Sequence, residues 1–415
     1  SKLLLSSITV DSVRTSVDNS LGVEVENDST INSFAVGHIT PVSIASGKTL
    51  SGGIGVTAGS IKLTDTGTLA SNVSMSGGIL DADNTLTVSG VLTQSGDITI
   101  DVLDNKTLSY SGAPLSLGSN TLSIVGAGTL SNVSGSSLVL DQTESILDLK
   151  GSGTVSGAVK LENGTLKSSG SATISGALTQ YSNASIEVSV NQTLSYSGAS
   201  LSLGANTLRF SGGGTFSNTN PLLLDNSSSK LLLSSITVGS VSTSVDNSLG
   251  VEVENDSTIN SFAVGNITPV SIASGKTLSG GIGVTAGSIK LTDTGTLASN
   301  VSMSGGTLDA DNTLTVSGTL THAGDITIDV AGTRTLTYTG TPISLGEHTL
   351  KLMGGGNLLS GGLKINNVNS KLLLSSITVD SVSTSVDNSL GVEVENDSTI
   401  SNFAVSNITP VSIAS

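Results

Sequence analysis

The chain has 415 residues and a net charge of −16, with 12 % charged residues, 2 % aromatic residues and neither Trp nor Cys. An acidic chain without a basic patch cannot neutralise phosphates, so we expect no nucleic-acid partner. It contains no apolar run of about 18 residues, so we expect no membrane-spanning segment, and it can form no disulfide bond. Few aromatic side chains argue against an ordinary globular core.

Short strands with one apolar face are predicted along the chain. Apolar residues occupy every second position at Leu21, Val23 and Val25, and again in residues 98–102 and 186–190. This period of two is typical of a half-buried strand, and turn-forming pairs such as Ser-Gly and Asp-Asn separate the strands.

Thr-Leu pairs recur along the chain at uneven spacings near 20 residues, which we interpret as one coil of three short strands. The uneven spacing favours a right-handed over a left-handed β-helix. The predicted fold class is therefore all-β, a single continuous right-handed parallel β-helix (β-solenoid) rod with roughly 20 residues per coil. The pairs used begin at Thr68, Thr85, Thr107, Thr121, Thr165 and Thr193.

Long internal repeats divide the chain into three parts. The segment SKLLLSSITV begins at Ser1, recurs at Ser229 with Gly after it, and begins again at Ser370. We predict a first large repeat over residues 1–228, a second over 229–369 and the truncated start of a third over 370–415, all within one solenoid. The first repeat contains an internal duplication with an offset of 86 residues, from Gly90 to Gly176. Whole modules can be gained or lost in a solenoid because each contacts only its neighbours, so we expect a parent chain longer than 415 residues.

An acidic trio recurs once in each large repeat. It is either a solvated face that keeps the protein soluble or a Ca²⁺ site, because Ca²⁺ prefers several oxygen ligands. The Asp-Ala-Asp-Asn turns at Asp81 and Asp309 are similar candidates. We expect no other cofactor. The candidate metal ligands of the trio are Glu24, Glu26, Asp28, Glu252, Glu254, Asp256, Glu393, Glu395 and Asp397.

No catalytic constellation is evident, so we expect no enzyme and assign no catalytic or cofactor-binding residues. His38 is replaced by Asn266 in the second repeat, and His322 corresponds to Gln94 in the first, which is unexpected for metal ligands or general bases. Threonines in Thr-x-Thr pairs do not recur once per coil in the sequence, so we also expect no regular Thr lattice.

The segments NTLTVSGTLTHAGDITIDV, GTLSNVSG and SGGIGVTAG resemble the passenger repeats of bacterial autotransporters and filamentous-haemagglutinin-like adhesins. The resemblance runs the length of the chain. It implies a right-handed β-helix, export across the cell envelope, and a role in attachment, aggregation or biofilm. It transfers no functional residues, because the shared pattern is architectural.

We therefore expect an extracellular or cell-surface structural and adhesive element, one segment of a long repetitive adhesin or fibre. Its expected partners are other copies of itself, associated end to end or laterally, and other cell surfaces or glycans. A carbohydrate-active β-helix enzyme and an ice- or mineral-binding repeat protein are the alternatives. An oligosaccharide-binding groove lined by carboxylates would favour the former, and a Thr ladder that recurs in every coil would favour the latter.

Overall fold

The computed structural model describes residues 1–18, 20–132 and 135–414. Within these residues the chain is all β, without a helix, and forms a right-handed parallel β-solenoid of about 19 turns with about 21 residues per coil. The predicted fold class is confirmed. Four residues of the repeats and motifs named above, Asn19, Val133, Ser134 and Ser415, lie outside the described residues.

The coils group into two compact units. Unit 1 comprises residues 1–201 and 211–220, and unit 2 comprises residues 202–210 and 221–415. The division into repeats at 228/229 and 369/370 is a division of the sequence and stays a prediction.

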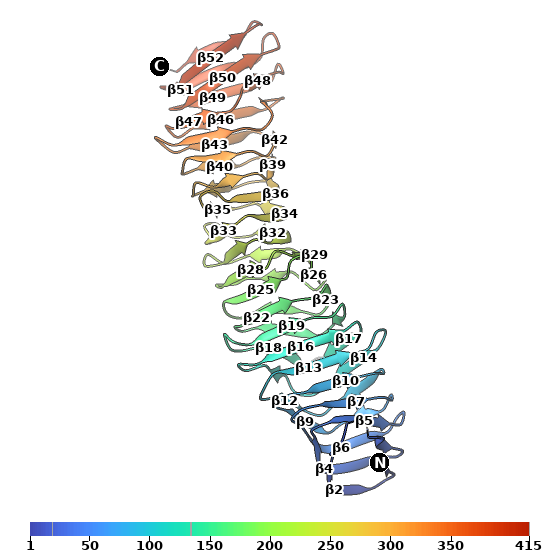
Figure 1. Cartoon of the computed structure of the whole chain (residues 1–415). Helices are drawn as coiled ribbons and strands as arrows, with labels where there is room; N and C mark the ends of the chain where they lie inside the picture. Colours follow the sequence, from blue (N-terminus) through green and yellow to red (C-terminus); the bar gives the residue numbers. More distant parts are fainter. Residues whose placement is uncertain (19, 133–134, 415) are drawn as a thin grey trace. The chain divides into compact units, whose positions relative to one another are not determined.

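The coils contribute strands to three faces, which we call face 1, face 2 and face 3; some coils have only two strands, and others have a separate strand on each face. In one coil of three strands, β10 (Ile79–Ala82) lies on face 1, β11 (Leu86–Val88) on face 2 and β12 (Leu92–Gln94) on face 3. Each strand pairs in parallel with strands of neighbouring coils on the same face, such as β10 with β13 (Ile98–Val102) (Figure 1). Likewise, β11 pairs with β14 (Thr107–Tyr110).

The strands of unit 1 are as follows. Face 1 also contains β1 (Lys2–Leu5), β3 (Gly22–Val25), β5 (Ile39–Ile44), β7 (Ser60–Leu63), β16 (Thr121–Gly126), β19 (Ile146–Leu149), β22 (Thr165–Ser168) and β25 (Ala184–Val188). Face 2 also contains β2 (Thr9–Arg14), β4 (Ser29–Val36), β6 (Thr49–Val56), β8 (Thr68–Leu69), β17 (Thr129–Asn132), β20 (Thr154–Val155), β23 (Ala172–Ile174), β26 (Thr193–Tyr196) and β29 (Thr215–Asn218). Face 3 also contains β9 (Asn72–Met75), β15 (Leu115–Ser116), β18 (Ser137–Leu140), β21 (Ala158–Leu161) and β24 (Leu178–Gln180).

Unit 2 repeats this arrangement. Its face 1 contains β31 (Lys230–Ser234), β33 (Gly250–Asn255), β35 (Ile267–Ile272), β37 (Ser288–Leu291), β40 (Thr307–Ala310), β43 (Ile326–Val330), β46 (Thr349–Met353), β49 (Lys371–Ser375), β51 (Gly391–Asn396) and β53 (Val411–Ile413). Its face 2 contains β32 (Thr237–Thr243), β34 (Ser257–Val264), β36 (Thr277–Val284), β38 (Thr296–Leu297), β41 (Leu314–Val316), β44 (Thr335–Tyr338), β47 (Asn357–Leu359), β50 (Thr378–Thr384) and β52 (Thr399–Val405). Its face 3 contains β30 (Leu222–Leu224), β39 (Asn300–Met303), β42 (Leu320–His322), β45 (Ile343–Ser344) and β48 (Leu363–Ile365); β27 (Leu201–Ser202) and β28 (Thr207–Ser211) contain residues of both units.

Some strands bend from face 2 onto face 3. Strand β6 pairs with β8 through its first two residues and with β9 through its last four. The bend lies at Gly52, whose φ is +111°, and a Cβ there would come within 1.9 Å of the Ile31 carbonyl oxygen. Only glycine is tolerated at such a close approach with positive φ.

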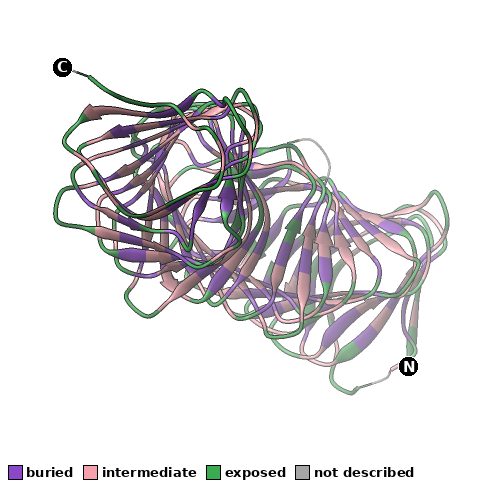
Figure 2. Ribbon diagram, turned by 90° about the horizontal axis from the view of Figure 1, so that it is seen from above, coloured by how far each residue is buried: buried purple, intermediate pink, exposed green. Residues whose placement is uncertain are grey.

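The core consists of aliphatic side chains stacked from coil to coil. On face 1 of unit 1, inward-pointing residues are in direct register, and buried residues alternate with more exposed ones along the strands (Figure 2). Burial of each such side chain contributes roughly 1.5–3 kcal/mol of hydrophobic stabilisation, so each added coil extends the core. One stack of unit 1 consists of Val23, Val42, Leu63, Ala82 and Val102, and unit 2 matches it with Val251, Val270, Leu291, Ala310 and Val330.

Two residues of the predicted alternating segments lie outside the core. Leu21 is 69 % exposed and Val190 is 64 % exposed. Both lie outside the strands, because β3 begins only at Gly22, whose φ is +74°, and β25 ends at Val188, shortly before Asn191 at φ +62°. The prediction that these two residues belong to an apolar strand face is therefore wrong.

Candidate functional surfaces

Face 1 carries ion pairs that join neighbouring coils. The first glutamate of each acidic trio pairs with a lysine from the preceding coil: Lys2 with Glu24, Lys230 with Glu252 at 2.5 Å, and Lys371 with Glu393 at 2.8 Å. Such partly exposed pairs contribute about 0.2–1 kcal/mol each. Their recurrence shows that all three repeats present the same surface here.

The other members of the trio have different surroundings. Glu254 accepts hydrogen bonds of 3.1 and 2.6 Å from the guanidinium of Arg209, and Glu395 accepts one of 3.0 Å from Lys351. Glu26 and Asp397 are exposed.

The aspartates of the first two trios stabilise turns. The carboxylate of Asp28 accepts a hydrogen bond from the backbone N–H of Thr49 at 2.9 Å, and Asp256 accepts one from Thr277 at 2.8 Å. These carboxylates hold the start of the next coil's face-2 strand. Among the residues that the structure describes, no group of three or more His, Cys, Asp or Glu lies close enough together to hold a metal ion. The calcium site stays an untested alternative to a solvated acidic face.

The Asp-Ala-Asp-Asn turns form charge-compensated clusters. The ammonium of Lys62 lies 3.3 Å from Asp81 and 2.8 Å from Asp83, and Lys290 makes the same contacts with Asp309 and Asp311 in unit 2. Burial raises the pKa of Asp81, and the hydrogen bond that Lys62 donates to the Asp83 carboxylate raises the pKa of Lys62. The lysine therefore occupies the position that a cation would take between these carboxylates.

His322 and Gln94, which are equivalent in sequence, share a structural role. The Nε2 atom of His322 lies 3.1 Å from the carbonyl oxygen of Ser344. The side-chain amide of Gln94 donates a hydrogen bond of 3.0 Å to the carbonyl oxygen of Leu117. Each side chain links its coil to the next, which explains why the two residue types interchange.

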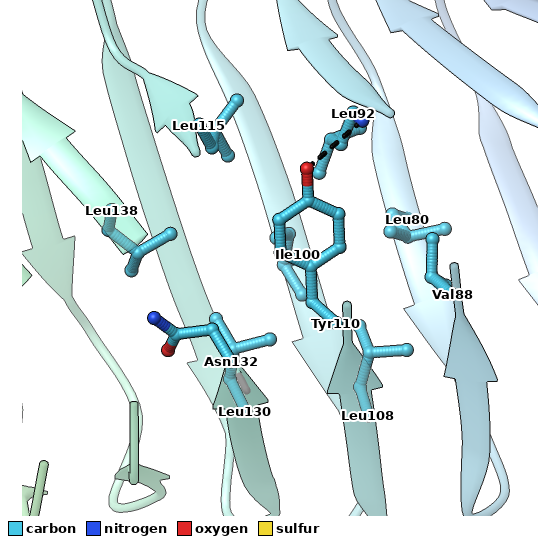
Figure 3. Close-up of a pocket in the computed structure, with 10 residues that line it drawn as sticks. All are labelled: Leu80, Val88, Leu92, Ile100, Leu108, Tyr110, Leu115, Leu130, Asn132 and Leu138. Atoms are coloured by element: carbon cyan, nitrogen blue, oxygen red, sulfur yellow. Dashed lines mark hydrogen bonds between the residues drawn. The ribbon is translucent and has the colours of Figure 1, made fainter. Parts of the chain in front are cut away.

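A small internal cavity lies in unit 1 beside Tyr110 (Figure 3). Its volume of about 10 Å³ is at the lower limit for a single water molecule. The Tyr110 hydroxyl accepts a hydrogen bond from the N–H of Leu92 at 3.2 Å and donates one to the carbonyl of Ala113 at 2.5 Å. The cavity is too small for a substrate. Apart from Tyr110 and Asn132, all the residues that line the cavity are aliphatic.

An open groove of about 420 Å³ crosses face 1 of unit 1. It contains two carboxylates, Asp97 and Asp148, and two lysines, Lys150 and Lys167. Asp97 accepts a hydrogen bond from the Thr121 N–H at 2.7 Å, so it has a structural role. Asp148 is mostly buried, and its Oδ2 lies 3.8 Å from the Lys150 ammonium.

Two columns of hydroxyl side chains follow face 2 of unit 1, one residue per coil in direct register. The expectation of no regular Thr lattice concerned Thr-x-Thr pairs, whereas these columns consist of single Thr or Ser residues. Their regular spacing is not visible in the sequence, because the loops between strands differ in length while the strand register stays constant. The first hydroxyl column is Thr49, Thr68, Thr87, Ser109 and Ser131, and the second hydroxyl column is Thr107, Thr129, Thr154, Thr173, Ser195 and Ser217. Unit 2 has a similar column of Thr277, Thr296, Thr315 and Thr337.

No known protein family, curated protein or solved structure matches the chain. In the described residues no helix is long and apolar enough to cross a membrane. The class that the fold defines is thus a parallel β-solenoid repeat protein. Neither the inter-coil ion pairs nor the hydroxyl columns were predicted, although Lys2 and Glu24 are separated by about one coil length in the sequence.

Proposed function

We propose that this chain is a structural and adhesive segment of a long extracellular surface protein or fibre, which serves attachment, cell–cell contact or a biofilm matrix. The observation that carries the proposal is the repetition of one surface. The pairs Lys2–Glu24, Lys230–Glu252 and Lys371–Glu393 occupy the same position on face 1 in each repeat. A surface repeated along stacked coils suits multivalent contact, in which many weak contacts add up.

The partners that fit this surface are glycans, other cell surfaces and further copies of the chain. Beads coated with the folded protein should attach to cells and to glycan-coated surfaces more often than beads coated with the heat-denatured chain. Glycosidase treatment of the target should lower attachment if glycans are the ligand. Equal attachment of folded and denatured coatings on every target would overturn the adhesive proposal.

A carbohydrate-active enzyme is the second candidate, because the face 1 groove holds Asp97 and Asp148. Release of reducing ends from polysaccharides, lost in Asp148→Asn, would support it. Unchanged polysaccharides after prolonged incubation with folded protein would exclude that activity for the substrates used.

A further inference from the structure

The second hydroxyl column is a continuous feature of a regular sheet. From β14 to β29 the successive pairings run in parallel without a register shift, and each coil places one Thr or Ser in the column. Where the two columns overlap, they stand two residues apart on the same strand, as Thr107 and Ser109 do on β14. The overlap covers β14 and β17, and β26 and β29 add Thr193 and Thr215 two residues before the column. The hydroxyls therefore repeat in two directions at both ends of the second column.

The spacings of this array follow from sheet geometry. Neighbouring strands lie about 4.8 Å apart, and alternate residues along a strand lie about 6.6 Å apart. The strand residues between the columns, such as Leu108 and Leu130, are buried, and their packing in the core holds the sheet in place. Thr side chains are stiff about χ1, so the hydroxyl and methyl groups of a Thr column hold their positions at little entropic cost.

The chemistry of this face excludes several ligands. Strands β8, β11, β14, β17, β20, β23, β26 and β29 contain no charged residue, and their aromatic residues, Tyr110, Tyr196 and Phe216, are buried. The face thus offers no ion pair to a charged ligand and no exposed ring on which a sugar could stack. A second copy docked on this face would meet no cationic side chain that could offset the repulsion between two chains of net charge −16.

We propose that the hydroxyl columns of face 2 in unit 1 bind ice. A rigid, neutral array that repeats in two directions fits a ligand that is itself a lattice of hydrogen-bonding oxygens. Oxygen atoms on the faces of hexagonal ice repeat over distances of the same order as the strand spacing and the two-residue spacing. Hydroxyls can join that lattice as donors and acceptors, and the Thr methyl groups fill the gaps between them. This proposal is independent of the adhesive function.

The test uses the full chain in a slowly growing ice sample, with protein measured in the ice and in the remaining liquid. The folded protein should enter the ice and should slow the recrystallisation of small ice crystals. Thr129→Lys and Thr154→Lys place a charged side chain in the middle of the second column and should abolish both effects. Thr93→Lys is the matched control, because Thr93 is an exposed strand residue on face 3 of the same unit.

Circular dichroism and melting temperature establish that each variant is folded. If the lysine variants fail to fold, Thr154→Val keeps the shape and removes one hydroxyl, and it should reduce ice uptake. Exclusion of the folded wild-type protein from ice would overturn the proposal. So would a loss of ice uptake in the Thr93→Lys control as large as that in the column variants. A different result would assign the face to a second copy of the chain. In that case the wild-type protein would stay out of ice and sediment as a dimer, and Thr129→Lys would make it monomeric.

Discussion

The phenolic oxygen of Tyr110 accepts a hydrogen bond from the backbone N–H of Leu92, which belongs to the preceding coil, at 3.2 Å. The same bond recurs between Tyr196 and Leu178 at 3.3 Å. A buried tyrosine thus satisfies an N–H at the start of a face 3 strand, where a neighbouring strand would otherwise have to supply the acceptor.

Tyr110→Phe should destabilise the fold by about 1–3 kcal/mol, because the Leu92 N–H and the Ala113 carbonyl are left without partners in a buried position. Urea unfolding followed by circular dichroism measures the change. The control is Tyr181→Phe, since Tyr181 is 60 % exposed and should tolerate the substitution within about 0.5 kcal/mol. Equal stability of the two variants would mean that the inter-coil bond contributes nothing.

Stability should fall at alkaline pH. Burial raises the pKa of Tyr110 and Tyr196 above the ordinary value of 10.0, and hydrogen bonding to Asp83 raises that of Lys62 above 10.5. A raised pKa in the folded state means that the protonated form is favoured by folding. This contribution is complete below the unfolded-state pKa and is lost as the pH rises through the folded-state value.

Melting temperatures measured between neutral pH and about pH 12 should therefore begin to fall near pH 10. Because Tyr110→Phe removes one of the titrating groups, that variant should show a shallower alkaline decline from its lower starting stability. A melting temperature that stays constant through this range would contradict the assignment of these groups.

The strand pattern and the coil length were predictable from the sequence, and residues 98–102, which form β13, are one example. Alternation of polar and apolar residues is a local property, and stacking of strands demands a nearly constant coil. Alternation did not predict where each strand begins and ends. Leu21 continues the alternation of Val23 and Val25, yet the backbone turns at Gly22 to pass the carbonyl of Pro41.

The candidate surfaces depended on register, which the sequence does not show. Thr107, Thr129, Thr154 and Thr173 occupy one column although their separations along the chain differ, because the corner loops absorb extra residues while the strands keep their pairing. The ion pair of Arg209 with Glu254 could not be predicted for the same reason, because these residues lie two coils apart.

Calcium should have no effect on stability at equilibrium. Glu252 and Glu254 already have cationic partners in Lys230 and Arg209, and Asp256 accepts a backbone hydrogen bond. A cation that binds only the folded state would raise the melting temperature with increasing concentration. We expect the same melting temperature in EDTA and in millimolar CaCl₂. A rise in CaCl₂ that is absent in the double variant Glu252→Gln, Glu254→Gln would establish the trio as a calcium site.

Removal of one module should leave a folded solenoid. Gly90 and Gly176 occupy equivalent corners: a Cβ at Gly90 would meet the carbonyl oxygen of Ser71 at 1.9 Å, and one at Gly176 would meet that of Gly157 at 1.9 Å. Deletion of residues 90–175 joins Ser89 to Gly176 and places Leu178 where Leu92 pairs with Val73. Coils contact only their neighbours, so each remaining strand keeps a partner of the same kind.

The deletion protein should show the same β-type circular dichroism as the full chain and unfold cooperatively, and unit 1 should be shorter by about 20 Å, or about four strand spacings. Its urea m-value should fall in proportion to the surface removed. Deletion of residues 86–175 is the control, because it also removes β11 and leaves one coil without its face 2 strand, which a longer corner loop cannot replace. We expect that control to misfold or aggregate. Failure of both proteins to fold would mean that the module is needed for more than length, since only the first deletion leaves every coil with its strands.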